Sequence, residues 1–149
     1  MDSVLWQERE GPLTESRTFA FLKPDTIKNR LVGEVLGRLE RKGFTFKVLR
    51  LHLITHKQAE ELYSVHKGKP FFQELVDHVT SGPVVLMILQ APNAVETLRK
   101  VIGATNPLTA EPGTIRGDLS VSITANVIHA SDSLENAKKE ASVFSLDAS

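Results

Sequence analysis

The sequence predicts an α/β protein whose folded part is a single domain. Four short apolar segments, rich in β-branched and aromatic residues, have the length of buried strands, and stretches with apolar residues at helical spacing lie between them. The chain has 149 residues, of which 41% are apolar and 24% charged. This balance is sufficient for one buried core and argues against disorder as the main state.

The first strand is expected at 17–22 (RTFAFL), which is a short, Phe-rich apolar run. Residues 1–16 carry a Gly-Pro pair and several acidic residues, so we expect them to form an extension ahead of a folded domain at 17–149. Pro24 disfavours helical geometry at the residue before it. Lys23 should therefore sit at the end of the strand.

A helix, a strand and a second helix are expected next. Apolar residues at helical spacing begin at Leu31, and Gly43 is a suitable residue to end that helix. Residues 44–54 alternate apolar and polar side chains with one shift of phase, which predicts a strand that contains a bulge. Thr55 and Gln58 form a capping box that opens a short helix.

The middle of the chain contains a helix, a strand and another helix. Pro70 can open the first of these helices, and Gly82 lies near its end. The run VVLMIL at 84–89 is the third expected strand. Asn93 can cap a helix that continues to about Gly103.

Residues 103–120 are expected to form a long loop, because they contain two prolines and three glycines. A structureless loop of this length in a compact domain is usually functional. Val121–His129 should contain the fourth strand, and either Asp132 or Ser133 can cap a last helix.

Periodicity alone leaves two sheet plans open. Strands separated by helices usually form a parallel sheet. The two central strands, at 44–54 and 84–89, are however connected by two short helices that can form a hairpin. A ferredoxin-like βαββαβ plan with added helices therefore fits as well.

Charge, cysteine content and hydropathy argue against several kinds of protein. The 18 basic and 18 acidic residues balance, which disfavours a nucleic-acid coat or a polybasic membrane anchor. Cysteine is absent, which removes disulfides and thiol chemistry and suits a reducing compartment. No signal-peptide core occurs, and the longest apolar run, 84–89, is too short to span a bilayer. We therefore expect a soluble, cytoplasmic protein.

Several familiar site motifs are absent or broken. The sequence has no P-loop, no protein-kinase motif and no zinc-protease motif. Residues 42–48 (KGFTFKV) resemble an RNA-recognition pattern, but Thr45 and Lys47 interrupt it, and Gly43 is explained as a helix stop. We therefore reject RNA binding as the function.

His129 is the histidine best placed for chemistry. It ends a strand (NVIH) and precedes a polar turn that opens a helix, where an imidazole is reachable and backbone N–H groups favour an anion. A satisfied structural histidine is the alternative interpretation, and it is the simplest one for His52, His56 and His78.

Three cations are the best phosphate ligands that the sequence offers. Lys23, Arg99 and Arg116 stand near Pro or Gly residues that interrupt regular structure, although each alone is an ordinary surface charge. Tyr63 and Phe71 are most simply packing residues.

Taken together, the segments resemble the nucleoside diphosphate kinase family. The resemblance covers about 17–144, and the family's order and spacing are kept in RTFAFLKPD, LVGEVLGRLERKGF, HKGKPFFQELV, TSGPVVLMI, GATNP, PGTIRGD and NVIHASDS. The combination of the KPD, PGTIRGD and NVIHASDS motifs is highly specific. The resemblance implies a ferredoxin-like fold with a four-stranded antiparallel sheet and additional helices.

The resemblance also implies roles for individual residues. His129 would take the phosphoryl group from a nucleoside triphosphate and pass it to a diphosphate, and Glu140 would orient the other ring nitrogen. Phe71 would stack on the base, with Leu75 beside it. Mg²⁺ would be bound mainly by the nucleotide phosphates and by water, and Asp132 would lie near the ion. The implied phosphate ligands are Lys23, Tyr63, Arg99, Thr105 and Arg116, and the implied ribose contacts are Asn126 and Lys23.

The implied reaction follows ping-pong kinetics, because a covalent intermediate divides it into two half-steps. The expected substrates are nucleoside tri- and diphosphates such as ATP and GDP, and base specificity should be low because stacking does not read hydrogen-bonding edges. The resemblance further implies a homo-oligomer, with a hexamer as the first expectation. No specific nucleic acid and no membrane is expected as a partner.

The sequence departs from the family at four places. Ala130 replaces a usual Gly, Thr124–Ala125 replaces Gly-Arg, Leu119 replaces a Phe, and Asn29–Arg30 replaces Arg-Gly. These changes leave turn geometry and subunit contacts open, because an Ala that needed a positive φ would strain its turn. Ala130 and the 124–125 pair motivate an alternative function, a catalytically silent nucleotide-binding or scaffold protein of the same fold.

Overall fold

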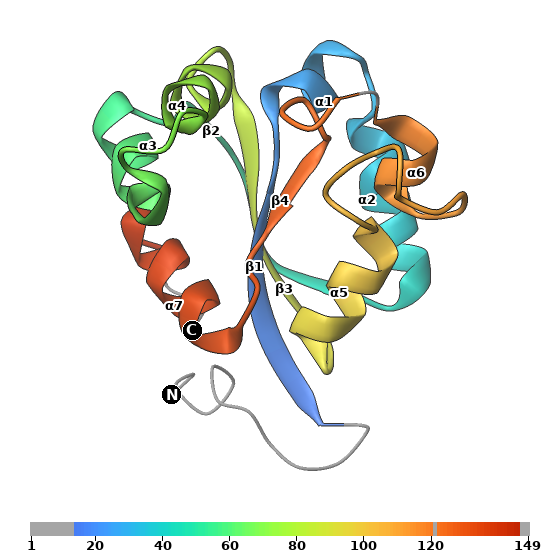
Figure 1. Cartoon of the computed structure of the whole chain (residues 1–149). Helices are drawn as coiled ribbons and strands as arrows, with labels where there is room; N and C mark the ends of the chain where they lie inside the picture. Colours follow the sequence, from blue (N-terminus) through green and yellow to red (C-terminus); the bar gives the residue numbers. More distant parts are fainter. Residues whose placement is uncertain (1–13, 121, 147–149) are drawn as a thin grey trace.

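The computed structural model describes residues 14–120 and 122–146, and its centre is a four-stranded sheet in the order β2-β3-β1-β4 (Figure 1). All three strand pairings are antiparallel. A parallel sheet is therefore wrong, and the ferredoxin-like plan is confirmed. The strands are β1 (Glu15–Leu22), β2 (Thr45–His52), β3 (Val84–Pro92) and β4 (Ile128–Ala130).

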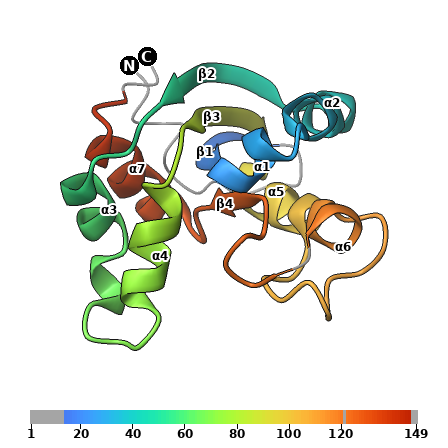
Figure 2. The same ribbon diagram turned by 90° about the horizontal axis from the view of Figure 1, so that it is seen from above.

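Helices cover both faces of the sheet. Helices α3, α4 and α7 lie on one face, and α2, α5 and α6 lie on the other (Figures 1 and 2). The helices are α1 (Pro24–Lys28), α2 (Val32–Lys42), α3 (His56–Leu62), α4 (Phe72–Val79), α5 (Ala94–Ile102), α6 (Ile115–Leu119) and α7 (Leu134–Val143), with a short 3₁₀ turn, η2 (Ser64–His66), between α3 and α4. In the described part of the chain, no helix has the length and apolar content that a membrane crossing requires.

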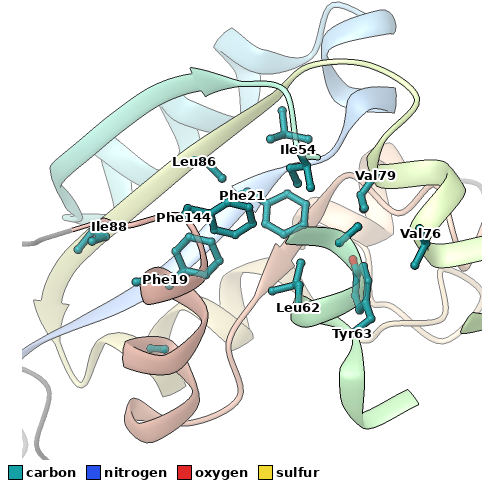
Figure 3. Packing of buried hydrophobic residues seen from close by; sticks show 14 residues of the cluster. Phe19, Phe21, Ile54, Leu62, Tyr63, Val76, Val79, Leu86, Ile88 and Phe144 are labelled. Atoms are coloured by element: carbon teal, nitrogen blue, oxygen red, sulfur yellow. The ribbon is translucent and has the colours of Figure 1, made fainter. Parts of the chain in front are cut away.

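The two central strands contribute to two cores at once. Phe19 and Phe21 point to the face covered by α3, α4 and α7, whereas Ala20 and Leu22 point to the other face (Figure 3 shows the first of these clusters). All four side chains are fully buried. Burying one such phenylalanine contributes up to about 3 kcal/mol, so the continuous apolar run of β1 follows from its central position.

Local signals in the first half of the chain are confirmed. Helix α2 ends at Gly43, which takes a φ of 114° that only glycine adopts freely. The expected bulge lies between Phe46 and Val48 in β2. The capping box at Thr55 is formed, with reciprocal hydrogen bonds between its side chain, the Gln58 side chain and their backbone amides. Helix α1 was not predicted.

The second half differs from expectation in two places. Helix α4 begins at Phe72 rather than Pro70. The segment 103–120 is not without structure, because α6 forms within it and the Thr114 hydroxyl caps this helix by accepting from the Gly117 amide at 3.0 Å. Of the two caps expected for α7, Ser133 is the one observed: its hydroxyl accepts from Asn136 N–H at 3.0 Å.

The ends of the domain are only partly described. Residues 1–13 of the expected extension lie outside the described residues, and β1 already begins at Glu15.

At the departures from the family pattern, Ala130 has no positive φ, so the strain considered for that turn is not present. Arg30 instead takes a φ of 60°, at a position where glycine would be less strained.

Candidate active site

One cavity of about 920 Å³ collects every site residue that the sequence predicts. Its wall is built from the end of β1, the turn after α3, one side of α4, the end of α5, the 103–126 segment, β4 and α7. The predicted residues in this wall are Lys23, Tyr63, Phe71, Leu75, Arg99, Thr105, Arg116, Asn126, His129, Asp132 and Glu140.

The His129 imidazole is fixed by a carboxylate on one nitrogen. Its Nε2 lies 2.7 Å from Glu140 Oε1, and the ring stacks on Phe21 with a centroid distance of 4.9 Å. Within the described residues no hydrogen bond engages Nδ1. An ionised Glu140 assigns the proton of a neutral ring to Nε2, which leaves the lone pair on Nδ1. The local structure therefore leaves Nδ1 as the ring nitrogen with an available lone pair.

Glu140 is itself held in place. Helix α7 returns its carboxylate to the start of the helix, where Glu140 Oε1 also accepts from the Ser131 hydroxyl at 2.7 Å. Ser131 is buried, and no role was expected for it from the sequence. Its place inside the NVIHASDS motif is the signal that could have identified it.

The hydroxyl of Tyr63 is buried close to this pair. The Tyr63 and His129 rings meet edge to face at 6.2 Å between centroids. The tyrosine hydroxyl has no hydrogen-bond partner within the described residues. Burial, and to a smaller extent the nearby charge of Glu140, raises the pKa of Tyr63 well above its ordinary value. A buried hydroxyl without a partner is costly, so a polar ligand in the cavity would satisfy it.

Lys23 and Asn126 form a buried polar pair beside the cavity. Lys23 Nζ donates to Asn126 Oδ1 at 2.7 Å and to the Thr124 carbonyl at 3.2 Å. Asn126 Nδ2 donates to the Thr105 carbonyl at 3.2 Å. Burial, followed by repulsion from Arg116, lowers the pKa of Lys23 to about 8.

Arg116 is tied to three backbone carbonyls around the cavity. Its guanidinium donates to Asn126 O at 3.2 Å, to Gly103 O at 3.2 Å and to Ile128 O at 2.6 Å. Burial, followed by the positive charge of Arg99, lowers the pKa of Arg116 to about 10. Desolvated cations that repel one another are stabilised by an anion, so the cavity is suited to phosphate groups.

The outer part of the cavity is apolar. Phe71 is 44% exposed and Ile123 is 58% exposed, and Leu75 is partly buried beside them in the wall. Exposed aromatic and aliphatic groups at a cavity mouth are suited to stacking on a flat ring. Ile123 was not singled out from the sequence, and no motif there could have identified it.

One of the carboxylates in the cavity wall is exposed at the turn after β4, where a metal ion could approach. Asp132 is exposed in the cavity wall, and its Oδ1 accepts from Asn136 Nδ2 at 2.5 Å. No group of three or more metal-ligating side chains occurs among the described residues. Mg²⁺ is commonly held by one or two carboxylates together with substrate phosphates, so this arrangement fits an ion that arrives with a nucleotide.

Named proteins are similar in sequence to this chain over most of its length. A sequence model of the family described as nucleoside diphosphate kinase matches residues 16–148. A nucleoside diphosphate kinase of Hyperthermus butylicus is 54% identical over 131 residues, which are 88% of this chain and 92% of that protein. One of Kosmotoga olearia is 55% identical over 86% of this chain and 87% of that protein.

Solved structures agree with the sequence relatives. A crystal structure of the apo nucleoside diphosphate kinase of Encephalitozoon cuniculi superposes with a TM-score of 0.85 at 42% identity, covering 88% of this chain and 89% of the other. The enzyme of Halobacterium salinarum, in complex with CDP, also gives 0.85, at 37% identity and 90% coverage of each chain. We conclude that this chain belongs to the nucleoside diphosphate kinase family of phosphotransferases.

Proposed function

We propose that the chain moves the terminal phosphoryl group of a nucleoside triphosphate to a nucleoside diphosphate through a phosphohistidine at His129. The observation that carries the proposal is the 2.7 Å contact of His129 Nε2 with Glu140, in a cavity that is also lined by Lys23, Arg99 and Arg116. An oriented imidazole supplies a nucleophile, and the three cations supply the charge that phosphoryl transfer requires.

The first half-reaction forms one bond and breaks one bond. The Nδ1 lone pair of His129 attacks the γ-phosphorus, the N–P bond forms, and the bond to the bridging oxygen breaks, which releases the diphosphate. Glu140 accepts the Nε2–H hydrogen bond throughout and stabilises the positive charge that develops on the ring. The second half-reaction is the reverse, with a different diphosphate as acceptor, so the kinetics are ping-pong.

The buried cations bind the phosphates and stabilise the transition state. Lys23 and Arg116 are both buried, and this loss of solvation lowers the pKa of each side chain. The equatorial oxygens of the transferring group would replace that solvation and accept hydrogen bonds from both side chains. Tyr63 and Thr105 would donate from neutral hydroxyls, and Asn126 together with Lys23 would contact the ribose.

A divalent cation fits the proposal as part of the substrate complex. Asp132 is the protein carboxylate that we place near Mg²⁺, in indirect contact with the ion. When bound, the ion neutralises phosphate charge. Stacking of the base on Phe71 reads no hydrogen-bonding edge, so we expect low base specificity.

Exposed leucines on and directly after an edge strand support the proposed homo-oligomer. Leu49, Leu51 and Leu53 are 50%, 67% and 66% exposed, and β2 is an edge of the sheet. Apolar side chains gathered on an unpaired edge favour contact with another chain. We propose a hexamer as the assembly and the cytoplasm as the location, the latter supported by the absence of cysteine.

Phosphoenzyme trapping tests the proposed function. Incubation with γ-labelled ATP, without acceptor, should label the protein in an acid-labile form, and addition of GDP should move the label to GTP. His129→Ala should take up no label. His56→Ala is the matched control, because His56 is exposed in α3 and does not line the cavity. An acid-stable label, or equal labelling of His129→Ala, contradicts the assignment.

A further inference from the structure

Val127 adopts a strained backbone conformation directly before the strand that carries His129. Its φ is 77°, and the Ile128 amide donates across it to the Asn126 carbonyl at 2.9 Å. A hydrogen bond from residue i+2 to residue i with this φ is a γ-turn of the rare, strained kind. A β-branched residue with positive φ is unfavourable on its own, so neighbouring groups must hold it.

Three groups from the segment after β1 hold Val127. The Lys23 amide and the Thr26 hydroxyl both donate to the Val127 carbonyl, at 2.8 and 2.5 Å. The Asp25 carboxylate accepts from the Val127 amide through Oδ2 at 3.1 Å. Asp25 is the one member of this group that binds the Val127 N–H.

Asp25 is anchored in turn by a histidine of α4. Its second oxygen, Oδ1, lies 2.9 Å from His78 Nε2, and both side chains are mostly buried. With one oxygen held by His78 and the other holding Val127, the carboxylate has little freedom to rotate. Neither Asp25 nor His78 lines the cavity, so neither is in the proposed set of groups that touch substrate.

The strained turn sets the direction of two site residues. Asn126 precedes Val127, and its Oδ1 accepts a hydrogen bond from Lys23 Nζ at 2.7 Å. His129 follows Val127 by two residues and lies in β4. A relaxed Val127 would rotate the peptide planes on both of its sides. It would therefore move Asn126 and His129 relative to each other, while leaving Arg99 in α5 and Phe71 at the start of α4.

We propose that Asp25 is a positioning residue for phosphoryl transfer: it holds Val127 in the γ-turn, and the turn aligns the His129 imidazole with Asn126 and Lys23. This inference rests on the proposed function. It assigns Asp25 no contact with the nucleotide. Its loss should therefore slow the formation of phosphohistidine more than it weakens nucleotide binding.

Rapid-quench measurement of His129 labelling from ATP tests the proposal, with the maximal rate and the half-saturating ATP concentration determined separately. Asp25→Ala should lower the maximal rate about tenfold or more, because the strained conformer loses the group that holds it. The half-saturating concentration should change less than about threefold, since Arg99 and Phe71, which supply phosphate and base contacts in the proposed function, lie on other segments. Asp25→Asn retains an oxygen for the Val127 amide and should recover most of the rate.

A second substitution should restore the rate if the turn is the route. Glycine adopts positive φ without strain, so Asp25→Ala combined with Val127→Gly should be labelled faster than Asp25→Ala alone. Asp77→Ala is the matched control, because Asp77 is exposed in α4 and away from the cavity. Folding of each variant is checked by circular dichroism. If Asp25→Ala does not fold, Thr26→Val removes another hydrogen bond to Val127 and carries the same comparison.

The outcomes separate this inference from the proposed function. An unlabelled wild type would remove the proposed function itself. A labelled wild type with equally fast, folded Asp25→Ala overturns the positioning role. If Asp25→Ala is labelled slowly and adding Val127→Gly does not raise its labelling rate, Asp25 does not act through the turn at Val127.

Discussion

The buried ammonium of Lys23 should make the stability of the protein depend on pH in a window where few other groups titrate. Burial, together with the charge of Arg116, lowers the pKa of Lys23 from 10.5 to about 8. Between these values the unfolded chain binds more protons than the folded protein, so the free energy of unfolding rises with pH. The destabilisation is fully present below about pH 8 and is gone above pH 10.5.

The size of the effect follows from the shift. A pKa that falls from 10.5 to about 8 on folding changes the free energy of unfolding by about 2 kcal/mol between pH 7 and pH 9.5. Urea unfolding of wild type and of Lys23→Met, at one protein concentration and several pH values, isolates this contribution because the other groups titrate in both proteins. Wild type should gain about 2 kcal/mol relative to Lys23→Met over that range.

The control and the refuting result are equally direct. Lys67 has an exposed side chain, so Lys67→Met should follow the wild-type curve. Lys23→Met should also lose phosphoryl transfer by a factor of about 100 or more, as expected for a donor that stabilises transition-state charge. If the curves of wild type and Lys23→Met run parallel from pH 7 to pH 9.5, the ammonium is not desolvated and the reasoning about the cation site is wrong.

Three further changes have definite expected outcomes. Glu140→Ala should slow phosphohistidine formation roughly 10- to 150-fold, because a charged hydrogen bond to the imidazole is lost, and Glu140→Gln should lose less; equal rates in single-turnover labelling would contradict this. Phe71→Ala should weaken the binding of ADP, GDP and CDP by a similar ~1–3 kcal/mol in calorimetry, whereas a loss confined to one base would show specific recognition. Gly117→Ala should lower the melting temperature by about 4 °C or more, because its Cβ would overlap the Glu111 carbonyl, while Gly33→Ala, where no atom lies within 4 Å of the added Cβ, should not; a stable Gly117→Ala protein would contradict the tight packing of α6.

Much of the local structure could be predicted because its causes are local. The Thr55 capping box, the glycine that ends α2 and the phase shift in β2 each depend on a few neighbouring residues. Helix α6 was missed because its five residues lie among prolines and glycines, and its cap at Thr114 is a side-chain contact within a loop. The short length of β4 also escaped prediction, because only three of its residues pair with β1.

The site was predicted as a set of residues, and the geometry that relates them was not. Motif residues from seven parts of the chain line one cavity, as the family resemblance implied. The neighbours that hold them were missed, because their chemistry is ordinary in sequence. Ser131 is one serine among several, and Asp25 becomes informative only when its oxygens are seen on Val127 and His78.

The sequence by itself determined the kinds of element, their order, the catalytic histidine candidate and the family, since these depend on residue type and spacing along the chain. The tertiary structure decided between the two sheet plans that periodicity left open, confirming the antiparallel sheet that the resemblance implied, and it alone decided that Lys23 loses its solvation against Asn126 and that Val127 is strained. Each of these involves residues that are far apart in the sequence: dozens of residues separate β1 from β3, and about a hundred separate Lys23 from Asn126 and Asp25 from Val127. Hydrogen bonding and desolvation depend on distances in space, which periodicity along the chain does not specify.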